Sequence, residues 1–523
     1  MRRSGLRARW AWAVAVLTAA VFARSLTASF LGMDDPVFIV RNDHLLLSSP
    51  RDLRFMFSLE WMHWYPLTWL SLALDRAVWG LRPFGFHLTS VLIHALNAAL
   101  AFYLLVELLG IKEERSDPEG LAAAAFGALL FSLHPLRVES VTWVTERSDV
   151  LCASFYLATV LAWMRGRFGA ALAFHILALA SKGVGVSAPF VLLLLDALGL
   201  SHRPWPGARR TFARLAPFFA FSAAVALMNK AAQDRFGTIW SLQSLGLWER
   251  MAVGCSSYAH GLAKTLWPSG LMGLYPMPVP FDAFQARFLL AVVLVVLLTV
   301  LAWRLLRRAP AFAAAWGAYL VVMAPMAGFI KGGPQLVADR YTYLSAFGFA
   351  GLAAAGLRRG LSSSRREACV AAAAILLLAL AGRTWLRQGD WLDTERFWVS
   401  EVATDPRDAI ARHFLGLERL KAGREQEAEE LVRAAIVLDP GLGPAHNSLA
   451  NILARTGRYE EALLHYREAL RLEPGAPAAR HNMASVLLRM GRRDEARALL
   501  REELSLYPAS EKTRALLESL DAP

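Results

Sequence analysis

The sequence predicts an all-α protein in which a polytopic membrane helix bundle of about eleven spans is followed by a solenoid of helical repeats. Residues 1–385 contain many separate apolar runs, which a soluble core does not need but a bilayer-spanning bundle does. Further along, charged residues take over and landmark residues recur every 34 positions. We therefore expect a membrane domain over 1–385, a linker or entry helix over 386–408 and a repeat domain over 409–523.

The apolar runs define eleven expected spans, and the charges between them define their orientation. With the N-terminus in the cytoplasm, alternate spans bring every Arg-rich loop to the cytoplasmic side, as the positive-inside rule requires. This arrangement holds only if the stretch 250–267, which fits either a span or an interfacial helix, does not cross. The repeat domain then lies outside the cytoplasm. The expected spans are 10–30, 84–109, 120–133, 149–164, 168–180, 184–200, 211–229, 286–303, 311–329, 341–357 and 367–385.

The distribution of charge argues against nucleic-acid binding. The chain carries 56 basic and 43 acidic residues, a net charge of +13. Residues 400–523 hold 18 basic and 20 acidic residues, so the whole surplus lies in the short loops of the first 399. A nucleic-acid protein would gather such charge on one face of a folded domain. The sequence also contains no phosphate-binding glycine motif between a strand and a helix.

The C-terminal part repeats in one register with a period of 34 residues. Pro406, Pro440, Pro474 and Pro508 mark it, and a glycine recurs at 423, 457 and 491. Small residues allow paired helices to pack closely, the glycine suits the turn inside each repeat, and proline stops the second helix. This is the tetratricopeptide (TPR) pattern. We expect three repeats and a capping helix over about 509–520.

Polar residues gather in the segments predicted to face outward. Asp34 and Asp35 follow the first span. Adjacent carboxylates can bind a cation, or one can act as a general base with a raised pKa; the alternative is a helix cap or solvated loop acids. An aromatic-rich stretch, 55–79, follows in the same loop and suits the membrane surface.

Three further outer segments carry ionisable side chains. The segment 133–149 forms either a polar site or an interfacial salt-bridge strip. Lys182 lies in a tight turn, and Arg340 suits a phosphate by its bidentate geometry, although both also fit simple interface anchors. The ionisable or phenolic residues of these segments are His134, Arg137, Glu139, Glu146, Arg147, Asp149, Lys182, Asp339, Arg340, Tyr341 and Tyr343.

Taken in order, these outer segments resemble one known family. They are similar to GT-C glycosyltransferases with TPR repeats, close to the cadherin-targeting transmembrane O-mannosyltransferases and their bacterial homologues. The resemblance spans nearly the whole chain. Its matching residues are Asp34-Asp35 with Asn42, Trp64-Tyr65-Pro66-Leu67, Leu74-Asp75, Gly85-Phe86-His87-Leu88, His94-Ala95-Leu96-Asn97, His134-Pro135, Glu139, Arg147-Ser148-Asp149, Ser181-Lys182, Trp267-Pro268, Tyr275-Pro276, Ala338 to Leu344 and Trp391.

The chain departs from that family at three places. Gly183 stands where the family often has an acidic residue after Ser-Lys, and Glu146 stands where it often has glycine before the arginine. The family's repeat array is commonly longer than the three repeats here. These departures bear on the substrate and the acceptor more than on the fold.

The resemblance implies an inverting transfer of a sugar, such as mannose or another hexose, from dolichyl or undecaprenyl phosphate to a hydroxyl, with protein Ser/Thr as the expected acceptor. Asp34, or equally Asp35, would take the acceptor's proton. Arg147, Lys182 and Arg340 would stabilise the phosphate leaving group. Glu139 would orient the acceptor or a cation, and the relatives leave the need for a divalent cation open. Further polar residues expected at the substrate site are His134, Asp149, Asp339, Tyr341 and Tyr343.

Other functions remain compatible with the sequence. The chain could be a non-enzymatic membrane scaffold whose TPR domain recruits protein complexes of the envelope or lumen. A flippase would want polar residues at mid-bilayer and paired halves of spans; the sequence has few such residues and no convincing halves. The Arg-rich, Lys-poor composition favours a bacterial inner membrane, with the TPR domain outside the cytoplasm; in a eukaryote the corresponding place is the ER membrane with a luminal TPR domain.

Overall fold

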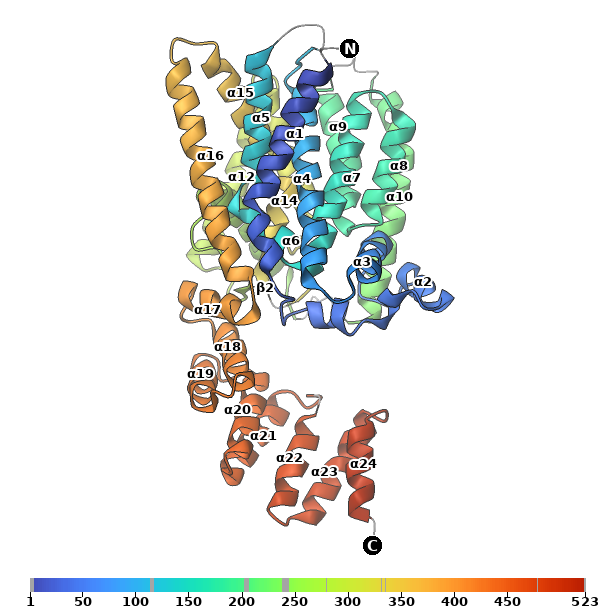
Figure 1. Cartoon of the computed structure of the whole chain (residues 1–523), viewed down its shortest axis with the longest axis vertical. Helices are drawn as coiled ribbons and strands as arrows, with labels where there is room; N and C mark the ends of the chain where they lie inside the picture. Colours follow the sequence, from blue (N-terminus) through green and yellow to red (C-terminus); the bar gives the residue numbers. More distant parts are fainter. Residues whose placement is uncertain are drawn as a thin grey trace. The chain divides into compact units, whose positions relative to one another are not determined.

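The computed structural model of the chain describes residues 4–112, 117–201, 207–237, 244–278, 280–330, 332–333, 335–476 and 478–521. The chain divides into two units, Met1–Thr394 and Glu395–Pro523. Over the described residues nearly all regular structure is helical, apart from one two-stranded antiparallel sheet that pairs β1 (Tyr275–Pro276) with β2 (Gln335–Val337). The predicted all-α fold class is confirmed (Figure 1).

Long helices build the first unit, and helices lie along each of the predicted spans. Four helical segments are long and apolar enough to cross a membrane: Pro83–Leu108, Ala208–Arg235, Ala286–Arg304 and Arg366–Trp391. A bent pair, Pro118–Ser132 with Pro135–Thr142, adds a fifth if it counts as one span. The chain is a multi-pass membrane protein. The helices of the bundle are α1 (Ser4–Val21), α4 (Pro83–Leu108), α5 (Pro118–Ser132), α7 (Arg147–Met164), α8 (Phe168–Leu179), α9 (Ala188–Ala197), α10 (Ala208–Arg235), α11 (Leu247–Leu266), α12 (Ala286–Arg304), α13 (Pro310–Met323), α15 (Phe347–Leu361) and α16 (Arg366–Gln388).

Close packing through small residues holds the centre of this unit together. Helix α4 packs against α1, α5 and α7, and α5 packs against α15. At the α5–α15 contact, a Cβ placed on Gly127 would lie 2.8 Å from the Ala354 side chain and 3.0 Å from the Ala350 carbonyl oxygen. In lipid the hydrophobic effect does not drive helices together. Small residues instead allow the helices to approach closely and gain van der Waals contacts. The bundle core is therefore set by glycine and alanine positions.

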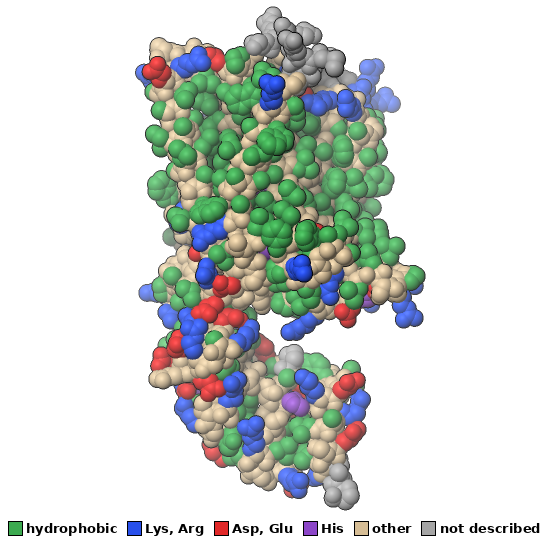
Figure 2. All heavy atoms as spheres, viewed as in Figure 1, with side chains coloured by type: hydrophobic (Ala, Val, Ile, Leu, Met, Phe, Trp, Pro, Cys, Tyr) green, Lys and Arg blue, Asp and Glu red, His purple; other side chains and the backbone are tan. Residues whose placement is uncertain are grey.

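Several of the Arg-rich segments that the sequence assigned to one side of the membrane meet at one end of the bundle. Figure 2 shows Lys and Arg gathered at that end of the first unit, above a belt of hydrophobic side chains. Side-chain contacts connect the N-terminal helix, the region between α4 and α5, the end of α7 and the α15–α16 turn. They are Arg7 with the Ile111 carbonyl, Arg165 with Glu107, Arg358 with Asp117 and Arg366 with Glu119.

Short elements occupy the segments predicted to lie at the opposite end. Several connect the long helices as single turns, and helix α3 continues the first loop toward α4. The aromatic side chains of this loop pack on one another: Trp61 contacts Phe38, Phe55 and Trp69, each of them edge-on. The short elements are η1 (Ala23–Thr27), η2 (Pro36–Val40), η3 (Asp43–Leu46), α2 (Pro50–Phe57), α3 (Pro66–Trp79), η4 (Pro135–Arg137), α6 (Val138–Thr142), η5 (Val144–Glu146), η6 (Gly183–Ser187), η7 (Asp339–Tyr341), α14 (Thr342–Ser345) and η8 (Gly389–Trp391).

The second unit consists of paired antiparallel helices in the predicted 34-residue register. The turn glycines 423, 457 and 491 have φ angles of 76°, 79° and 78°, a left-handed conformation that favours glycine. The side chain six residues after each repeat proline, at 412, 446, 480 and 514, donates to that proline's carbonyl oxygen. The helices are α17 (Thr394–Thr404), α18 (Ala409–Lys421), α19 (Glu425–Leu438), α20 (Gly443–Arg455), α21 (Tyr459–Leu472), α22 (Ala479–Arg489), α23 (Arg493–Leu506) and α24 (Glu511–Asp521).

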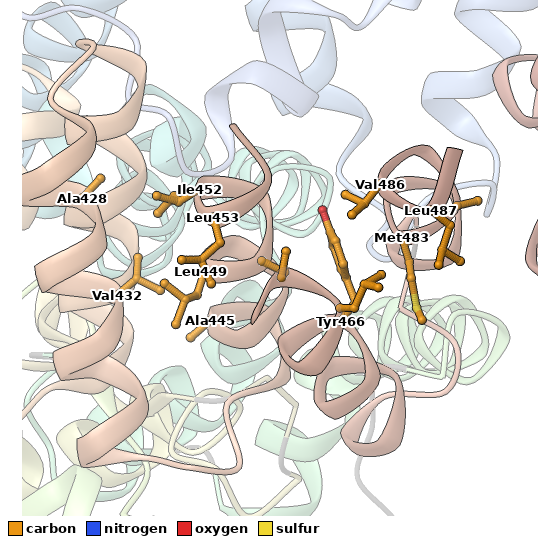
Figure 3. Close-up of a cluster of buried hydrophobic side chains, with 14 of the residues drawn as sticks. Ala428, Val432, Ala445, Leu449, Ile452, Leu453, Tyr466, Met483, Val486 and Leu487 are labelled. Atoms are coloured by element: carbon orange, nitrogen blue, oxygen red, sulfur yellow. The ribbon is translucent and has the colours of Figure 1, made fainter. Parts of the chain in front are cut away.

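One continuous apolar core runs through the repeats (Figure 3). Leu449 and Leu453 of α20 and Tyr466 of α21 are at most 1% exposed and join neighbouring helix pairs. A single repeat could not bury its apolar face, so each repeat is stabilised by the interface with its neighbours.

We predict that Leu453→Ala destabilises the repeat unit by about 2–5 kcal/mol, because it removes a fully buried side chain and leaves a cavity. Hydrogen exchange of the full-length protein should show faster exchange over 443–472. Leu464→Ala in the same repeat, at a side chain that is 62% exposed, is the matched control and should change exchange little. Equal effects of the two substitutions would contradict the repeat core.

Candidate active site at the loop end of the membrane unit

The two adjacent carboxylates of the first loop have different environments. Asp35 is fully buried, and its carboxylate accepts hydrogen bonds from the Leu31 N–H at 2.8 Å, the Thr145 N–H at 3.0 Å and the Thr145 hydroxyl at 2.6 Å. Burial raises the pKa of Asp35 to about 6, although these bonds act in the opposite direction. Asp35 therefore ties the first loop to η5 and has little capacity left for a substrate.

Asp34 precedes Asp35 in the chain, but its carboxylate takes no part in these hydrogen bonds. The residue is exposed, and within the described part of the chain no hydrogen bond or ion pair to its side chain is seen. The surrounding protein raises the pKa of Asp34, the Glu146 carboxylate raises it further, and Arg340 lowers it. An accessible carboxylate with a raised pKa is the kind of group that acts as a general base.

Arg340 lies at the centre of a group of charged side chains that we call the ionic cluster: Asp34, Glu139, Glu146, Asp149, Lys182 and Arg340. It forms a charge-assisted hydrogen bond through its guanidinium to Glu139, and its backbone N–H donates to the other Glu139 oxygen at 2.8 Å. Its Nε lies 3.1 Å from the Glu146 carboxylate. The guanidinium carbon also lies 5.7 Å from the centre of the Trp143 ring and 5.4 Å from that of Tyr341. These contacts join η7 to the segment 139–146.

Lys182 completes the cluster from a third segment. Its Nζ contacts Glu146 at 2.7 Å and Asp149 at 2.9 Å, and Asp149 also accepts from the Ser140 hydroxyl at 3.0 Å. Burial alone would raise the pKa of Glu146, but Lys182 and Arg340 lower it below its usual range, so Glu146 carries a negative charge. The turn that carries Lys182 is held by α3, since Thr68 donates to the Ser181 carbonyl at 2.8 Å.

Asp339 heads a smaller neighbouring group. Its carboxylate accepts from the Tyr275 hydroxyl at 2.9 Å and faces His260 Nε2 at 3.4 Å. These contacts join η7 to α11 and β1, one residue before Arg340. Sequence reasoning did not single out His260, because it lies on the helix 247–266 whose position was left open.

Other residues expected at the site lie elsewhere in the structure. Arg147 is fully buried; it pairs with Asp75 at 2.7 Å and donates to Ser90, Ser71 and the Phe86 carbonyl. The Tyr343 hydroxyl lies 2.6 Å from His94 Nδ1 and accepts from Asn97 at 3.0 Å. The His134 ring bonds to the Thr265 carbonyl at 3.1 Å. In this structure Arg147 and Tyr343 fasten helices together through buried hydrogen bonds.

The ionic cluster can perform two kinds of chemistry. Its cations can stabilise an anion, and Asp34 can remove a proton. Among the described residues no group of three or more His, Cys, Asp or Glu side chains is arranged to hold a metal ion. The sequence had left a divalent cation open.

Comparisons with known proteins show which proteins this chain is similar to. Protein O-mannosyl-transferase Tmtc1 of Drosophila melanogaster is 24% identical over 503 residues, covering 74% of this chain and 55% of that protein. Protein O-mannosyl-transferase TMTC1 of Homo sapiens is 23% identical over 524 residues, covering 86% of this chain and 58% of that protein. The resemblance to the TPR-bearing transmembrane O-mannosyltransferases is confirmed. Protein O-mannosyl-transferase TMTC4 of Homo sapiens is 31% identical over 158 residues, covering 28% and 21%.

The match to the O-mannosyltransferases has a limited extent along the relatives. The chain spans little more than half the length of the relatives that it matches along most of its own sequence. A family model described as tetratricopeptide repeat matches residues 453–518, which confirms the repeat assignment. Among solved structures, a TPR protein of Thermus thermophilus is 24% identical with a TM-score of 0.23, covering 33% of this chain and 89% of that one.

We predict that Asp75→Asn lowers the stability of the membrane unit by about 3–5 kcal/mol, because it leaves the buried Arg147 charge unpaired. Thermal unfolding of the full chain in detergent measures this. Glu107→Gln is the matched control, since its pair with Arg165 has the same length of 2.7 Å but is partly exposed, and should cost at most about 1 kcal/mol. Wild-type stability in Asp75→Asn would remove the structural role of this pair.

Proposed function

We propose that the protein is an inverting glycosyltransferase that moves a sugar, mannose or another hexose, from a polyprenyl-phosphate donor to the hydroxyl of a protein Ser or Thr. The observation that carries the proposal is the position of Asp34, an exposed carboxylate that interacts electrostatically with Arg340 and with Glu146, the carboxylate that also pairs with Lys182. The relatives are named protein O-mannosyl-transferases, which supports the same class of reaction.

In the proposed reaction, Asp34 accepts the proton of the acceptor hydroxyl as its oxygen attacks the anomeric carbon. The bond between that carbon and the phosphate oxygen breaks on the opposite side, and the electron pair leaves with the phosphate. The anomeric configuration inverts, and the products are a glycosylated protein and a polyprenyl phosphate. Lys182 and Arg340 stabilise the charge that develops on the leaving phosphate, and their fixed positions avoid reorganisation during the step.

Two features support a site at the exoplasmic face with a lipid-borne donor. The Arg-rich contacts lie at one end of the bundle, and the ionic cluster is built from the segments between the other helix ends. The positive-inside rule assigns the Arg-rich end to the cytoplasm. The TPR repeats would supply a surface for an extended protein acceptor or partner.

A membrane scaffold that recruits protein complexes through its TPR repeats is the second candidate function, favoured by the repeat match alone. A scaffold gives no reason for burying three carboxylates and two cations together, since buried ionic groups carry a desolvation cost. The ionic cluster is therefore the feature by which we rank the enzyme first.

We predict that Asp34→Asn lowers sugar transfer by about 10²–10⁴-fold without changing thermal unfolding, because it removes the proton acceptor from an unengaged side chain. Asp35→Asn should lower stability, since an amide cannot reproduce all three accepted hydrogen bonds. Membranes carrying each variant would be incubated with labelled dolichyl- and undecaprenyl-phosphate sugars. Asp43→Asn, at an exposed acid of the same loop, is the control. Full transfer by Asp34→Asn would refute the base assignment.

We further predict an acid limb in the pH profile of kcat/KM, because Asp34 must be deprotonated to act. Since the surrounding protein and the Glu146 charge raise the pKa of Asp34, the limb should lie above the pH at which an ordinary aspartate titrates. Glu146→Gln removes one of these causes and should move the limb to lower pH. The profile would be measured on the transfer reaction in detergent. If Glu146→Gln leaves the acid limb at the same pH, the limb does not report the deprotonation of Asp34.

A further inference from the structure

Glu146 holds the two cations of the ionic cluster in an unusual way. One carboxylate oxygen contacts Lys182 Nζ at 2.7 Å, and the other lies 3.1 Å from Arg340 Nε. The side chain thus bridges the cations with a separate oxygen for each. Its side chain retains an exposed fraction of 12%, so the bridge is reachable from outside.

This arrangement matches what a phosphate would require. A phosphoryl group also presents two oxygens from one centre, carries negative charge, and binds Arg and Lys through charge-assisted hydrogen bonds. A phosphate that contacts both Lys182 and Arg340 would therefore occupy the space that Glu146 now fills, and its negative charge would replace that of Glu146. Both anions cannot occupy the bridge together, because two like charges so close repel strongly.

We propose that the Glu146 carboxylate occupies the donor-phosphate position in the empty enzyme and must swing out for the donor to bind. This inference rests on the proposed function and adds a selectivity device to it. Displacing Glu146 costs free energy. A polyprenyl-phosphate donor is held at the membrane surface by its chain, so its headgroup meets the site at a far higher effective concentration than free phosphate does. Free phosphate has no such anchor, so it is excluded while lipid-linked phosphate binds.

The rest of the cluster can keep its shape during this exchange. Lys182 retains Asp149 at 2.9 Å, and Arg340 retains Glu139 and its backbone contact to it. The backbone near Glu146 is fixed by the bonds from Thr145 to Asp35. The change is therefore a rotation of one side chain, and removing that side chain should leave a folded protein in which each cation keeps one carboxylate partner and has an open donor direction.

The test measures binding of farnesyl phosphate, inorganic phosphate and farnesol to the full-length protein in detergent. Wild type should bind farnesyl phosphate and should not bind inorganic phosphate at millimolar concentration. Glu146→Ala should bind farnesyl phosphate at least tenfold more tightly and should also bind inorganic phosphate, while farnesol binding stays the same. Glu146→Gln keeps the shape without the charge and should lie between. Glu107→Gln, at the other end of the bundle, should behave as wild type.

The possible outcomes separate this inference from the proposed function. Unchanged or weaker farnesyl phosphate binding by a normally melting Glu146→Ala, with wild-type transfer intact, overturns the displacement alone. Failure of both wild type and Glu146→Ala to bind farnesyl phosphate, together with no transfer from any polyprenyl donor, overturns both proposals. Tighter binding of farnesol in Glu146→Ala also counts against the inference, because the gain would then be apolar and not ionic.

Discussion

The loop end of the membrane unit is organised by one chain of buried ion pairs, from Lys182 through Glu146 to Arg340 and Glu139. Charges removed from water are tolerated only when partners compensate them, and breaking one pair leaves an uncompensated charge. Segments far apart in the sequence must therefore meet at one place for the unit to fold. The same requirement fixes the geometry of two cations and of the surface that Asp34 borders, so folding itself assembles the chemistry.

Regular patterns made most of the fold predictable. Apolar runs are local properties of the chain, and so are the glycine and proline landmarks of a 34-residue repeat. Gly457 sits in a left-handed turn, as its place in the repeat predicted. The number of membrane crossings stays a prediction, because helices such as α8 and α9 are shorter than a bilayer requires and only four or five segments qualify by length and composition. Length in a broken helix depends on tertiary packing, which hydropathy does not report.

For the candidate site, the sequence identified segments that the fold brings together, whereas the roles of their residues stay predictions. Asp34 and Asp35 are equal in sequence, and only the fold directs Asp35 toward Thr145 and leaves Asp34 open. Arg147 had the right chemistry for a phosphate, yet its donors are directed inward to Asp75 and to serine hydroxyls. Two residues on one helical turn can point to opposite sides, so adjacency in a loop says little about which side chain meets a substrate.

Glu146 shows how the structural and catalytic demands on this cluster are connected. Two buried cations without anions would destabilise the empty protein, because their desolvation would go uncompensated. Three carboxylates supply the compensation, but two of them, Glu139 and Asp149, each serve a single cation while Glu146 serves both. Releasing Glu146 thus leaves each cation with one partner and one open donor direction. A site built this way stays paired at rest and becomes able to bind an anion by moving a single side chain beside the acid that would take the acceptor's proton.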